Sequence, residues 1–374
     1  MPEQVKSGSR VLRPGYTTGT CAAAAAAAAA QWLFWGVCPR AVEVDLPGGG
    51  KAVLEVGGGR REGGAAHCWV VKDAGDDPDV TGGMAVWASV REAGCGVQVR
   101  GGPGVGVVTR PGLSVPPGQP AINPVPRQMI ARAVERVLPA GRGAEVTISV
   151  PGGEEVAKKT MNPRLGIVGG ISILGTTGLI VPFSQKACRE ALVLQVAQAV
   201  ALGFSDVILT PGRKGEKLAV EVYGLPAGAV AQMGNYAGHL LGESARLGVK
   251  GVILFGHLGK LAKLAAGIFY THSRTADARR ETLIAHAALE GAPRPVLQRL
   301  WEAGTAEEAA AVIKGAGWER VFCRLATEAA RRAEEYTGGR LEAGAVLTSL
   351  SGEVLGYSQK AAVIGERLGW RGLR

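Results

Sequence analysis

Residues 251–260 read Gly-Val-Ile-Leu-Phe-Gly-His-Leu-Gly-Lys, and they set the fold that we expect for the second half of the chain. The apolar run 251–255 predicts a buried strand, and the two glycines after it predict a tight turn into a helix. In open α/β sheets, ligands bind outside the carboxyl ends of such strands, so His257 and Lys260 are candidate site residues. A Walker A loop would need glycine at position 254, where leucine stands, so a nucleoside triphosphatase is not expected.

A second strand of the same kind precedes this one. Residues 206–210 are apolar and run into a basic turn at 211–214. Helices are predicted around the two strands, over residues 187–202 and 229–247. Strands that alternate with helices and are apolar on both faces are typical of parallel sheets. We therefore expect a Rossmann-like three-layer α/β/α domain that presents Arg213, Lys214 and Lys260 at one crevice.

The remainder of the second half is patterned mainly as helices. They are predicted over residues 282–289, 295–301, 306–314 and 321–336, and a strand is predicted over 345–350. The run Thr-His-Ser-Arg at 271–274 falls in a loop. His257 and His272 lie at loop positions and are favoured as site residues. His239 and His286 lie inside helical patterns and are expected to be structural.

The first half has a different pattern of predicted elements, with short strands bounded by glycine and proline. Strands are predicted over residues 41–46, 52–56, 68–72, 96–99, 105–109 and 145–150, and helices over 21–35, 84–93 and 126–138. This order predicts an N-terminal α+β domain, residues 1–178, followed by the C-terminal Rossmann-like α/β domain, residues 179–374.

A threonine-rich turn, Gly-Tyr-Thr-Thr-Gly-Thr-Cys at 15–21, leads into a run of nine alanines. Thr18 or Thr20 can cap the helix that follows, and the free N–H groups of its first turn can bind an anion. The alternative is a simple helix cap, with alanines that permit close packing. A second Thr-Thr-Gly occurs at 176–178.

Two further loops of the first half are rich in aspartate or glycine. Residues 72–81 hold four aspartates, and their spacing does not fit the calcium-binding loop of an EF-hand. Three roles remain open for this loop: its aspartates cap turns, they position a cofactor or take part in catalysis, or they bind a metal. Residues 101–106 could cradle a phosphate but do not follow the G-x-G-x-x-G pattern. The proline-dense stretch 111–126 behind them should be extended and rigid.

The composition is that of a globular protein with a surface that attracts anions. The 374 residues carry a formal net charge of +10, and 47% of them are hydrophobic. Six dispersed cysteines without a C-x-x-C pair predict no bound metal, no disulfide framework and a cytoplasmic protein. Nine residues of the uncharged stretch 21–38 are alanine, which favours a buried helix over a signal peptide or a membrane span.

Six segments of the chain, taken in order, carry a resemblance to a known family: residues 15–30, 72–82, 102–126, 175–184, 256–263 and 267–273. Together they resemble the CbiD family, the cobalt-precorrin-5B C(1)-methyltransferases of the anaerobic route to cobalamin. The resemblance implies a cytoplasmic enzyme that moves a methyl group from S-adenosylmethionine to ring carbon 1 of a cobalt-containing tetrapyrrole, yielding cobalt-precorrin-6A. The last quarter of the chain contributes least to it.

The resemblance and the loop chemistry together suggest roles for particular residues. The methyl donor carries a sulfonium and an ammonium, so carboxylates of the acidic loop should face it, whereas the substrate's many carboxylates suit basic loops. As catalytic residues we expect Asp73, Asp76, His257 and His272. As cofactor-binding residues we expect Thr17, Thr18, Gly19, Thr20, Gly102, Gly104, Thr176 and Thr177. As substrate-binding residues we expect Arg213, Lys214, Lys260 and Arg274.

Two other classes of function compete with this one. A nucleic-acid-binding protein would explain the positive charge, but aromatic residues are only 5% and the basic residues are dispersed, so neither nucleic acid nor membrane is an expected partner. A phosphate-transferring enzyme would explain the glycine-rich loops and Lys260. The sequence does not decide the oligomeric state, and a homo-oligomer is one possibility.

Overall fold

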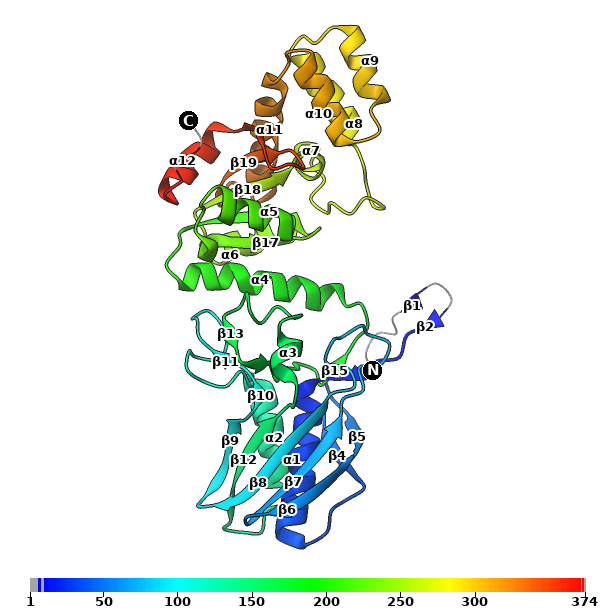
Figure 1. Ribbon diagram of the computed structural model, residues 1–374, viewed down its shortest axis with the longest axis vertical. Coiled ribbons are helices and arrows are strands. Elements are labelled where there is room, and N and C mark those ends of the chain that lie inside the picture. The colour runs from blue at the N-terminus through cyan, green and yellow to red at the C-terminus, as the bar shows by residue number, and fades with distance from the viewer. Residues whose placement is uncertain (1–5, 8–9, 371, 373–374) are drawn as a thin grey trace. The chain divides into compact units, whose positions relative to one another are not determined.

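Figure 1 shows the computed structural model of the chain, which describes residues 6–7, 10–370 and 372. The contacts divide it into two compact units, Met1–Gln185 and Lys186–Arg374. This division falls shortly after residue 178, where the sequence placed the boundary. Helices and strands occur in both units, so the expectation of a mixed α/β class is confirmed.

A five-stranded sheet forms the centre of the first unit, in the order β6-β7-β8-β12-β9. Strands β12 and β9 are parallel, and the other neighbours are antiparallel. The strands are β6 (Gly58–Glu62), β7 (Ala65–Val71), β8 (Ala85–Ala93), β9 (Gly96–Gly101) and β12 (Gly143–Ser149). Helices α1 (Thr18–Trp35) and α2 (Pro124–Glu135) pack against each other and against one face of this sheet.

Helix α1 is the centre of the first unit's core. All nine alanines, Ala22–Ala30, are buried, and their small side chains let the helix lie close to strands β7 and β8. The helix begins at the cap Thr17 and ends at Gly36, whose φ of 78° is the left-handed conformation typical of a helix C-terminus. None of the helices in the described part of the chain is both long and apolar enough to cross a membrane.

The helix predicted over residues 84–93 is wrong, because this segment is strand β8. Val86, Ala88 and Val90 are fully buried beneath α1, while Trp87 and Ser89 between them lie on the opposite face. This alternation is the two-residue period of a strand. The alternation outweighs the helix preference of the three alanines in this segment.

Helix α3 (Gly153–Ala157) and short strands complete the first unit. The strands are β1 (Lys6–Ser7), β2 (Arg10–Val11), β3 (Gly15–Tyr16), β4 (Ala41–Asp45), β5 (Lys51–Glu55), β10 (Gly104–Val105), β11 (Val107–Val108), β13 (Ile167–Val168), β14 (Gly170–Ile171) and β15 (Leu179–Ile180). The strand predicted over 105–109 is thus divided in two. Strand β10 pairs with β14 and β11 with β13. The division falls at Gly106, where a Cβ atom would lie 2.5 Å from the Ile167 side chain.

The second unit contains a sheet in the order β17-β16-β18-β19-β20, in which β17, β16, β18 and β19 are parallel and β20 is antiparallel. The strands are β16 (Asp206–Thr210), β17 (Val230–Gln232), β18 (Gly251–His257), β19 (Glu342–Thr348) and β20 (Val354–Tyr357). Alternate residues of β16 belong to different apolar clusters, Val207 and Leu209 to one and Ile208 to the other. Both faces of the sheet are therefore covered.

Helices from different parts of the chain cover the two faces. One cluster includes residues of α4 (Gln185–Ala201), α6 (Ala237–Arg246), α7 (Leu258–Ala265), α8 (Arg279–Leu289), α9 (Arg294–Glu302), α10 (Ala306–Gly315) and α11 (Arg320–Tyr336). The other includes residues of the π-helical turn Leu218–Val222, which follows α5 (Arg213–Lys217), and of α12 (Gln359–Arg367). Figure 1 shows α8, α9 and α10 gathered beyond α7 and α11.

The single helix predicted over 229–247 is wrong at its first part. A 3₁₀ turn at Ala227–Ala229 leads into strand β17, and α6 begins only at Ala237. Gly234, with a φ of 56°, lies in the turn between them. This left-handed residue interrupts any continuous helix, and the apolar residues before it fit a short buried strand equally well.

Candidate functional site

The carboxyl edge of the second unit's sheet is the best-formed candidate site. Strand β17 adds to one side of β16 and β18 to the other, so the chain reverses the direction of sheet growth between β16 and β18. Ligands of open α/β sheets bind at such a point. The turn after β16 lies against the carboxyl end of β18, since a Cβ atom at Gly256 of β18 would lie 2.6 Å from the Pro211 ring.

Lys260 lies in the first turn of α7 and is held by neutral oxygens. Its Nζ atom donates to Asn235 Oδ1 at 2.8 Å and to the Thr271 carbonyl at 3.3 Å. Burial lowers the pKa of Lys260, and the positive charges of Lys263 and Arg279 lower it further. The sequence prediction placed Lys260 at this edge but did not connect it with Asn235 or Thr271.

Lys263 is a residue of this region that the sequence prediction missed. Its side chain is 2% exposed, and its Nζ atom donates to the carbonyls of Thr271 at 3.3 Å and Ala276 at 2.9 Å. The two lysine side chains therefore share one carbonyl acceptor. The sequence did carry a signal for this residue: Lys263 follows Lys260 by three residues, on the same face of an otherwise apolar helix.

The two predicted catalytic histidines both contact residues of the same region. His257 Nδ1 accepts from Gly259 N–H at 3.1 Å and so caps α7, while its Nε2 lies 2.7 Å from Glu307 Oε1. His272 Nδ1 accepts from Arg274 N–H at 3.2 Å. Each imidazole thus has a structural role, and a catalytic role for either stays a prediction.

Aromatic rings adjoin the lysines. Tyr236 and Tyr270 have ring centroids 5.4 Å apart, and the His272 ring stacks on Tyr270 at 6.2 Å with an interplanar angle of 14°. Tyr236 directly follows Asn235, and Thr271 lies between Tyr270 and His272 in the chain. The three rings, all half-buried, therefore stand next to the acceptors of Lys260.

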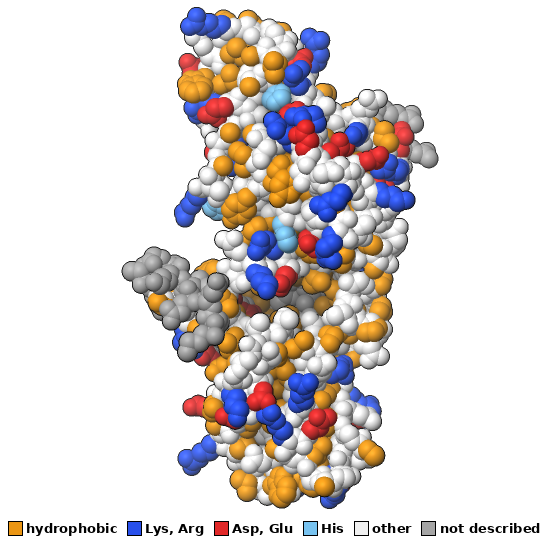
Figure 2. Space-filling view, turned by 180° about the vertical axis from the view of Figure 1, so that it is seen from behind, with side chains coloured by type: hydrophobic (Ala, Val, Ile, Leu, Met, Phe, Trp, Pro, Cys, Tyr) orange, Lys and Arg blue, Asp and Glu red, His pale blue; other side chains and the backbone are white. Residues whose placement is uncertain are grey.

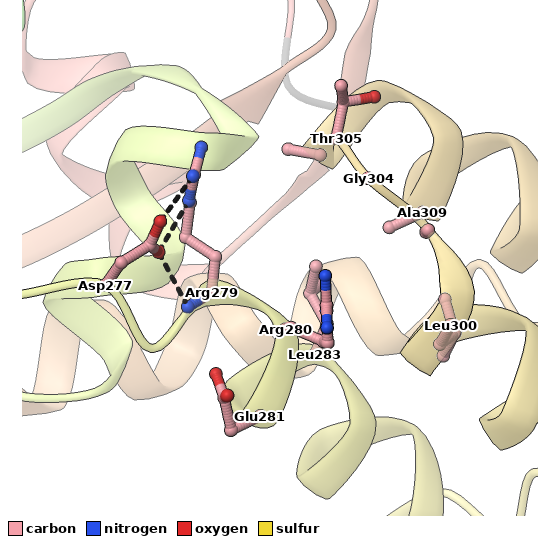
Figure 3. A pocket seen from close by; sticks show the side chains of 11 residues that line it. Asp277, Arg279, Arg280, Glu281, Leu283, Leu300, Gly304, Thr305 and Ala309 are labelled. Atoms are coloured by element: carbon pink, nitrogen blue, oxygen red, sulfur yellow. Dashed lines mark hydrogen bonds and ion pairs between the residues drawn. The ribbon is translucent and has the colours of Figure 1, made fainter. Parts of the chain in front are cut away.

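A pocket of about 200 Å³ lies between α8, α9 and α10, as Figure 3 shows. Asp277 and Arg279 face each other at its edge, with Arg279 Nε 2.7 Å from Asp277 Oδ1. This pairing lowers the pKa of Asp277 to about 2. The Arg280 guanidinium lies 5.4 Å from the centre of the Trp301 ring.

The other predicted substrate-binding residues are exposed. Arg213 and Lys214 begin α5 directly after β16, and Arg274 lies in the loop between α7 and α8. Arg213, Lys214 and Lys260 thus follow the carboxyl ends of adjacent strands. Their contact with a substrate stays a prediction.

In the first unit, the acidic loop is tied to the N-terminal segment. The Arg13 guanidinium forms an ion pair with Asp73, and Asp76 Oδ2 accepts from the Arg13 N–H at 2.7 Å. The hydrogen bond from Arg13, then that from Gly75 N–H, lowers the pKa of Asp73 to about 2. Asp73 is therefore ionised at neutral pH while its side chain stays 46% exposed.

The remaining aspartates of this loop, Asp77 and Asp79, cap no helix, because strand β8 and not the helix predicted over 84–93 follows. Asp77 accepts from Phe183 N–H at 3.0 Å. Asp79 accepts from Thr81 N–H at 2.8 Å and pairs with Lys72, whose side chain is 1% exposed. Asp79 therefore neutralises a lysine buried beside the core of the first unit.

The predicted cofactor-binding threonines of α1 mostly hold the helix itself. Thr17 Oγ1 accepts from Thr20 N–H, Thr18 Oγ1 bonds with the Leu174 backbone, and Thr20 Oγ1 donates to the Gly178 carbonyl at 2.7 Å. Gly19 N–H donates to the Leu174 carbonyl at 3.0 Å. The bond between Thr17 and Thr20 is that of a helix cap, and the others join the start of α1 to residues 174 and 178. Thr176 and Thr177, in contrast, are exposed.

The glycines at 102 and 104 also have structural reasons. A Cβ atom at Gly102 would lie 2.4 Å from Ser149 Oγ, and one at Gly104 would lie 1.8 Å from the Val150 carbonyl oxygen. Neither position has room for a side chain, because neighbouring atoms lie too close to the glycine backbone. Among the described residues, no cluster of three or more histidine, cysteine or acidic side chains is placed to hold a metal ion.

Comparisons with known proteins agree over nearly the whole length of the chain. The CbiD family model matches residues 5–182, and the model of the CbiD C-terminal domain matches residues 270–359. A curated protein from Moorella thermoacetica, named cobalt-precorrin-5B C(1)-methyltransferase, is 48% identical over 356 residues, covering 94% of this chain and 97% of its own. A protein of the same name from Alkaliphilus metalliredigens is 42% identical over 371 residues, 99% and 98% of the two chains.

A solved structure is also similar in sequence. The crystal structure of the cobalamin biosynthesis protein (cbiD) from Archaeoglobus fulgidus is 31% identical, covers 77% of this chain and 87% of its own, and has a TM-score of 0.39.

Proposed function

Because the chain belongs to the CbiD family, we propose that it is an enzyme that transfers a methyl group to ring carbon 1 of cobalt-precorrin-5B, giving cobalt-precorrin-6A. The observation that carries the proposal is identity of 42% to 48% with curated C(1)-methyltransferases over 94% to 99% of the chain. The cobalt is part of the substrate. An anaerobic biosynthetic step of this kind fits a cytoplasmic enzyme.

S-adenosylmethionine is the proposed methyl donor, since its sulfonium supplies a methyl group that a carbon nucleophile can displace in line. The bond from sulfur to the methyl carbon breaks as the bond to the ring carbon forms, and the sulfur keeps the electron pair. The protein's part is to hold the two reactants in line, and fixed geometry can contribute on the order of 7–11 kcal/mol.

The tetrapyrrole substrate is proposed to bind at the carboxyl edge of the second unit's sheet, which we interpret as a Rossmann-like domain. Its carboxylate side chains would meet Arg213, Lys214, Lys260 and Arg274, all of which follow strands or helices at this edge. Figure 2 shows basic side chains dispersed among acidic ones on the face that it presents. This distribution supports a small polyacid as the ligand rather than a nucleic acid, which needs a basic stripe.

The donor is proposed to bind near the acidic loop of the first unit. Asp73, whose pKa is lowered to about 2, presents an ionised carboxylate there, and Asp76 lies in the same loop. Carboxylates suit the donor's two cationic groups and its ribose hydroxyls. Since the hydroxyls of Thr17, Thr18 and Thr20 already hold α1, we expect the donor to contact the exposed Thr176 and Thr177 rather than these three.

Exchanging the carboxylates of the acidic loop tests this placement. Asp73→Asn or Asp76→Asn should weaken binding of S-adenosylmethionine several-fold and leave binding of a corrinoid unchanged, because the amide keeps the shape but not the charge. Isothermal titration calorimetry measures both dissociation constants. Asp45→Asn is the matched control, because Asp45 is an exposed aspartate of the same unit that also pairs with an arginine, Arg136. Weaker corrinoid binding with an unchanged donor constant would contradict the placement.

The proposed activity is tested by anaerobic incubation of the protein with cobalt-precorrin-5B and S-adenosylmethionine carrying a radioactive methyl group. We expect label in the corrinoid and formation of S-adenosylhomocysteine in equal amounts. A corrinoid that stays unlabelled, while a related methyltransferase labels its own substrate in parallel, would reject the proposal.

A further inference from the structure

Two lysines on one face of α7 form no ion pair in the described part of the chain, although the charge of Lys263 helps to lower the pKa of Asp277. The structure gives Lys260 and Lys263 only neutral oxygen acceptors, and neither forms an ion pair with a carboxylate among the described residues. Lys263 is almost fully buried and Lys260 is half-buried. An isolated buried cation is unfavourable unless an anion lies near it. An anionic ligand would supply that counter-charge to the two lysines.

Asp277, the acidic side chain on which Lys263 acts electrostatically, is already held by an arginine. Asp277 binds Arg279 through both carboxylate oxygens and also accepts from the Arg279 N–H, as the dashed lines in Figure 3 mark. Its charge is therefore shared with an arginine that itself contributes to lowering the pKa of Lys260. Counted by residue type, Lys260, Lys263 and Arg279 against Asp277 leave a formal excess of two positive charges.

The half-buried rings of Tyr236, Tyr270 and His272 add a second kind of recognition. They stand beside the acceptors of the lysines, since Asn235 precedes Tyr236 and Thr271 separates the other two rings. Aromatic rings pack favourably against other flat, apolar surfaces. The region therefore combines a cationic group with an aromatic surface.

We propose that Lys260, with buried Lys263 behind it, binds a carboxylate on the rim of the tetrapyrrole, and that the rings of Tyr236, Tyr270 and His272 contact its macrocycle. This inference rests on the proposed function. Lys263 is a positioning residue, because it holds the carbonyls of Thr271 and Ala276 and does not itself reach the surface. The methyl donor fits this place poorly, because its own carboxylate lies beside an ammonium that the two lysines would repel.

The test uses two stable corrinoids as probes. Cobyrinic acid has a rim of free carboxylates, and its fully amidated counterpart has the same macrocycle without these charges. In the full-length chain, Lys260→Met should raise the dissociation constant of cobyrinic acid at least about tenfold, as expected for loss of a charge-assisted hydrogen bond. The dissociation constant of the amide should stay unchanged. Tyr270→Leu should weaken binding of both probes by similar factors, since it removes only the ring.

Lys250→Met is the matched control, because Lys250 is an exposed lysine next to the opposite, amino end of β18. It should bind both probes as the unchanged protein does. Equal loss of acid and amide binding in Lys260→Met, or weaker binding of S-adenosylhomocysteine instead of cobyrinic acid, would overturn the inference.

Failure of this inference is distinct from failure of the proposed function. If the unchanged protein methylates cobalt-precorrin-5B and Lys260→Met has the same KM and the same dissociation constants, the enzyme assignment stands and the carboxylate site is wrong. If Lys260→Met loses cobyrinic acid binding but the unchanged protein transfers no methyl group, the anion site stands and its assignment to this substrate is wrong.

Discussion

Replacing Gly104 with alanine should lower the free energy of unfolding by about 3–5 kcal/mol. Gly104 has a φ of 77°, and a Cβ atom there would lie 1.8 Å from the Val150 carbonyl oxygen. The carbonyl of Gly104 is itself packed against Gly153 and Gly170, so the backbone has little room to move aside. Urea titration followed by far-ultraviolet circular dichroism measures the change.

Gly141→Ala separates the two causes of this loss. Gly141 has a φ of 78°, but a Cβ atom there would meet nothing within 4 Å. It should cost only about 1–2 kcal/mol, the cost of the left-handed conformation alone. Equal losses at the two positions would show that the close packing around Gly104 does not contribute, and that the chain moves aside more easily than the structure implies.

Replacing Lys72 with methionine should cost about 3 kcal/mol of stability at neutral pH. The substitution removes the ammonium that lies 2.8 Å from Asp79 and leaves a partly buried carboxylate without its cation. The value lies at the low end for a buried pair, because Asp79 is 26% exposed and keeps its bonds to Thr81. Lys51→Met, which breaks the exposed pair with Glu43, should cost less than about 1 kcal/mol.

The cost of Lys72→Met should also depend on pH. Burial raises the pKa of Asp79, but the hydrogen bonds from Lys72 and Thr81 outweigh it and hold the pKa below its ordinary value of 3.8. A carboxyl whose pKa is lower in the folded state contributes stability above pH 3.8 and loses it as the pH falls through the folded value. The difference between the two proteins should therefore shrink below about pH 4. A difference that grows on acidification would contradict the ion pair.

Elements that a local pattern determines were predicted well. Strand β16 has the predicted bounds, and α1 and α11 begin within three residues of prediction. An apolar run marks β16 and α1, and apolar residues at helical spacing mark α11. Strand β8 and the start of α6 were predicted wrongly. In β8 the alternation of residues was a local signal for a strand, and the pairing with β7 and β12, which a single segment does not reveal, strengthens it.

The candidate site was predicted only where its residues directly follow a strand. His257 and Lys260 carry such a signal, whereas Asn235, Lys263 and Thr271 come from a turn, a helix and a loop that meet only in the folded chain. The same limit applies to the acidic loop. Nothing in the sequence around Asp73 indicates that Arg13, 60 residues earlier, binds it.

The central claim is that this chain methylates ring carbon 1, and the most direct measurement locates the transferred carbon. The protein is incubated anaerobically with cobalt-precorrin-5B and S-adenosylmethionine labelled with carbon-13 in its methyl group, and the purified corrinoid is examined by carbon-13 nuclear magnetic resonance. The account predicts a single enriched methyl signal that couples to ring carbon 1. Enrichment at another ring position, or none in a preparation that binds both reactants, would contradict it.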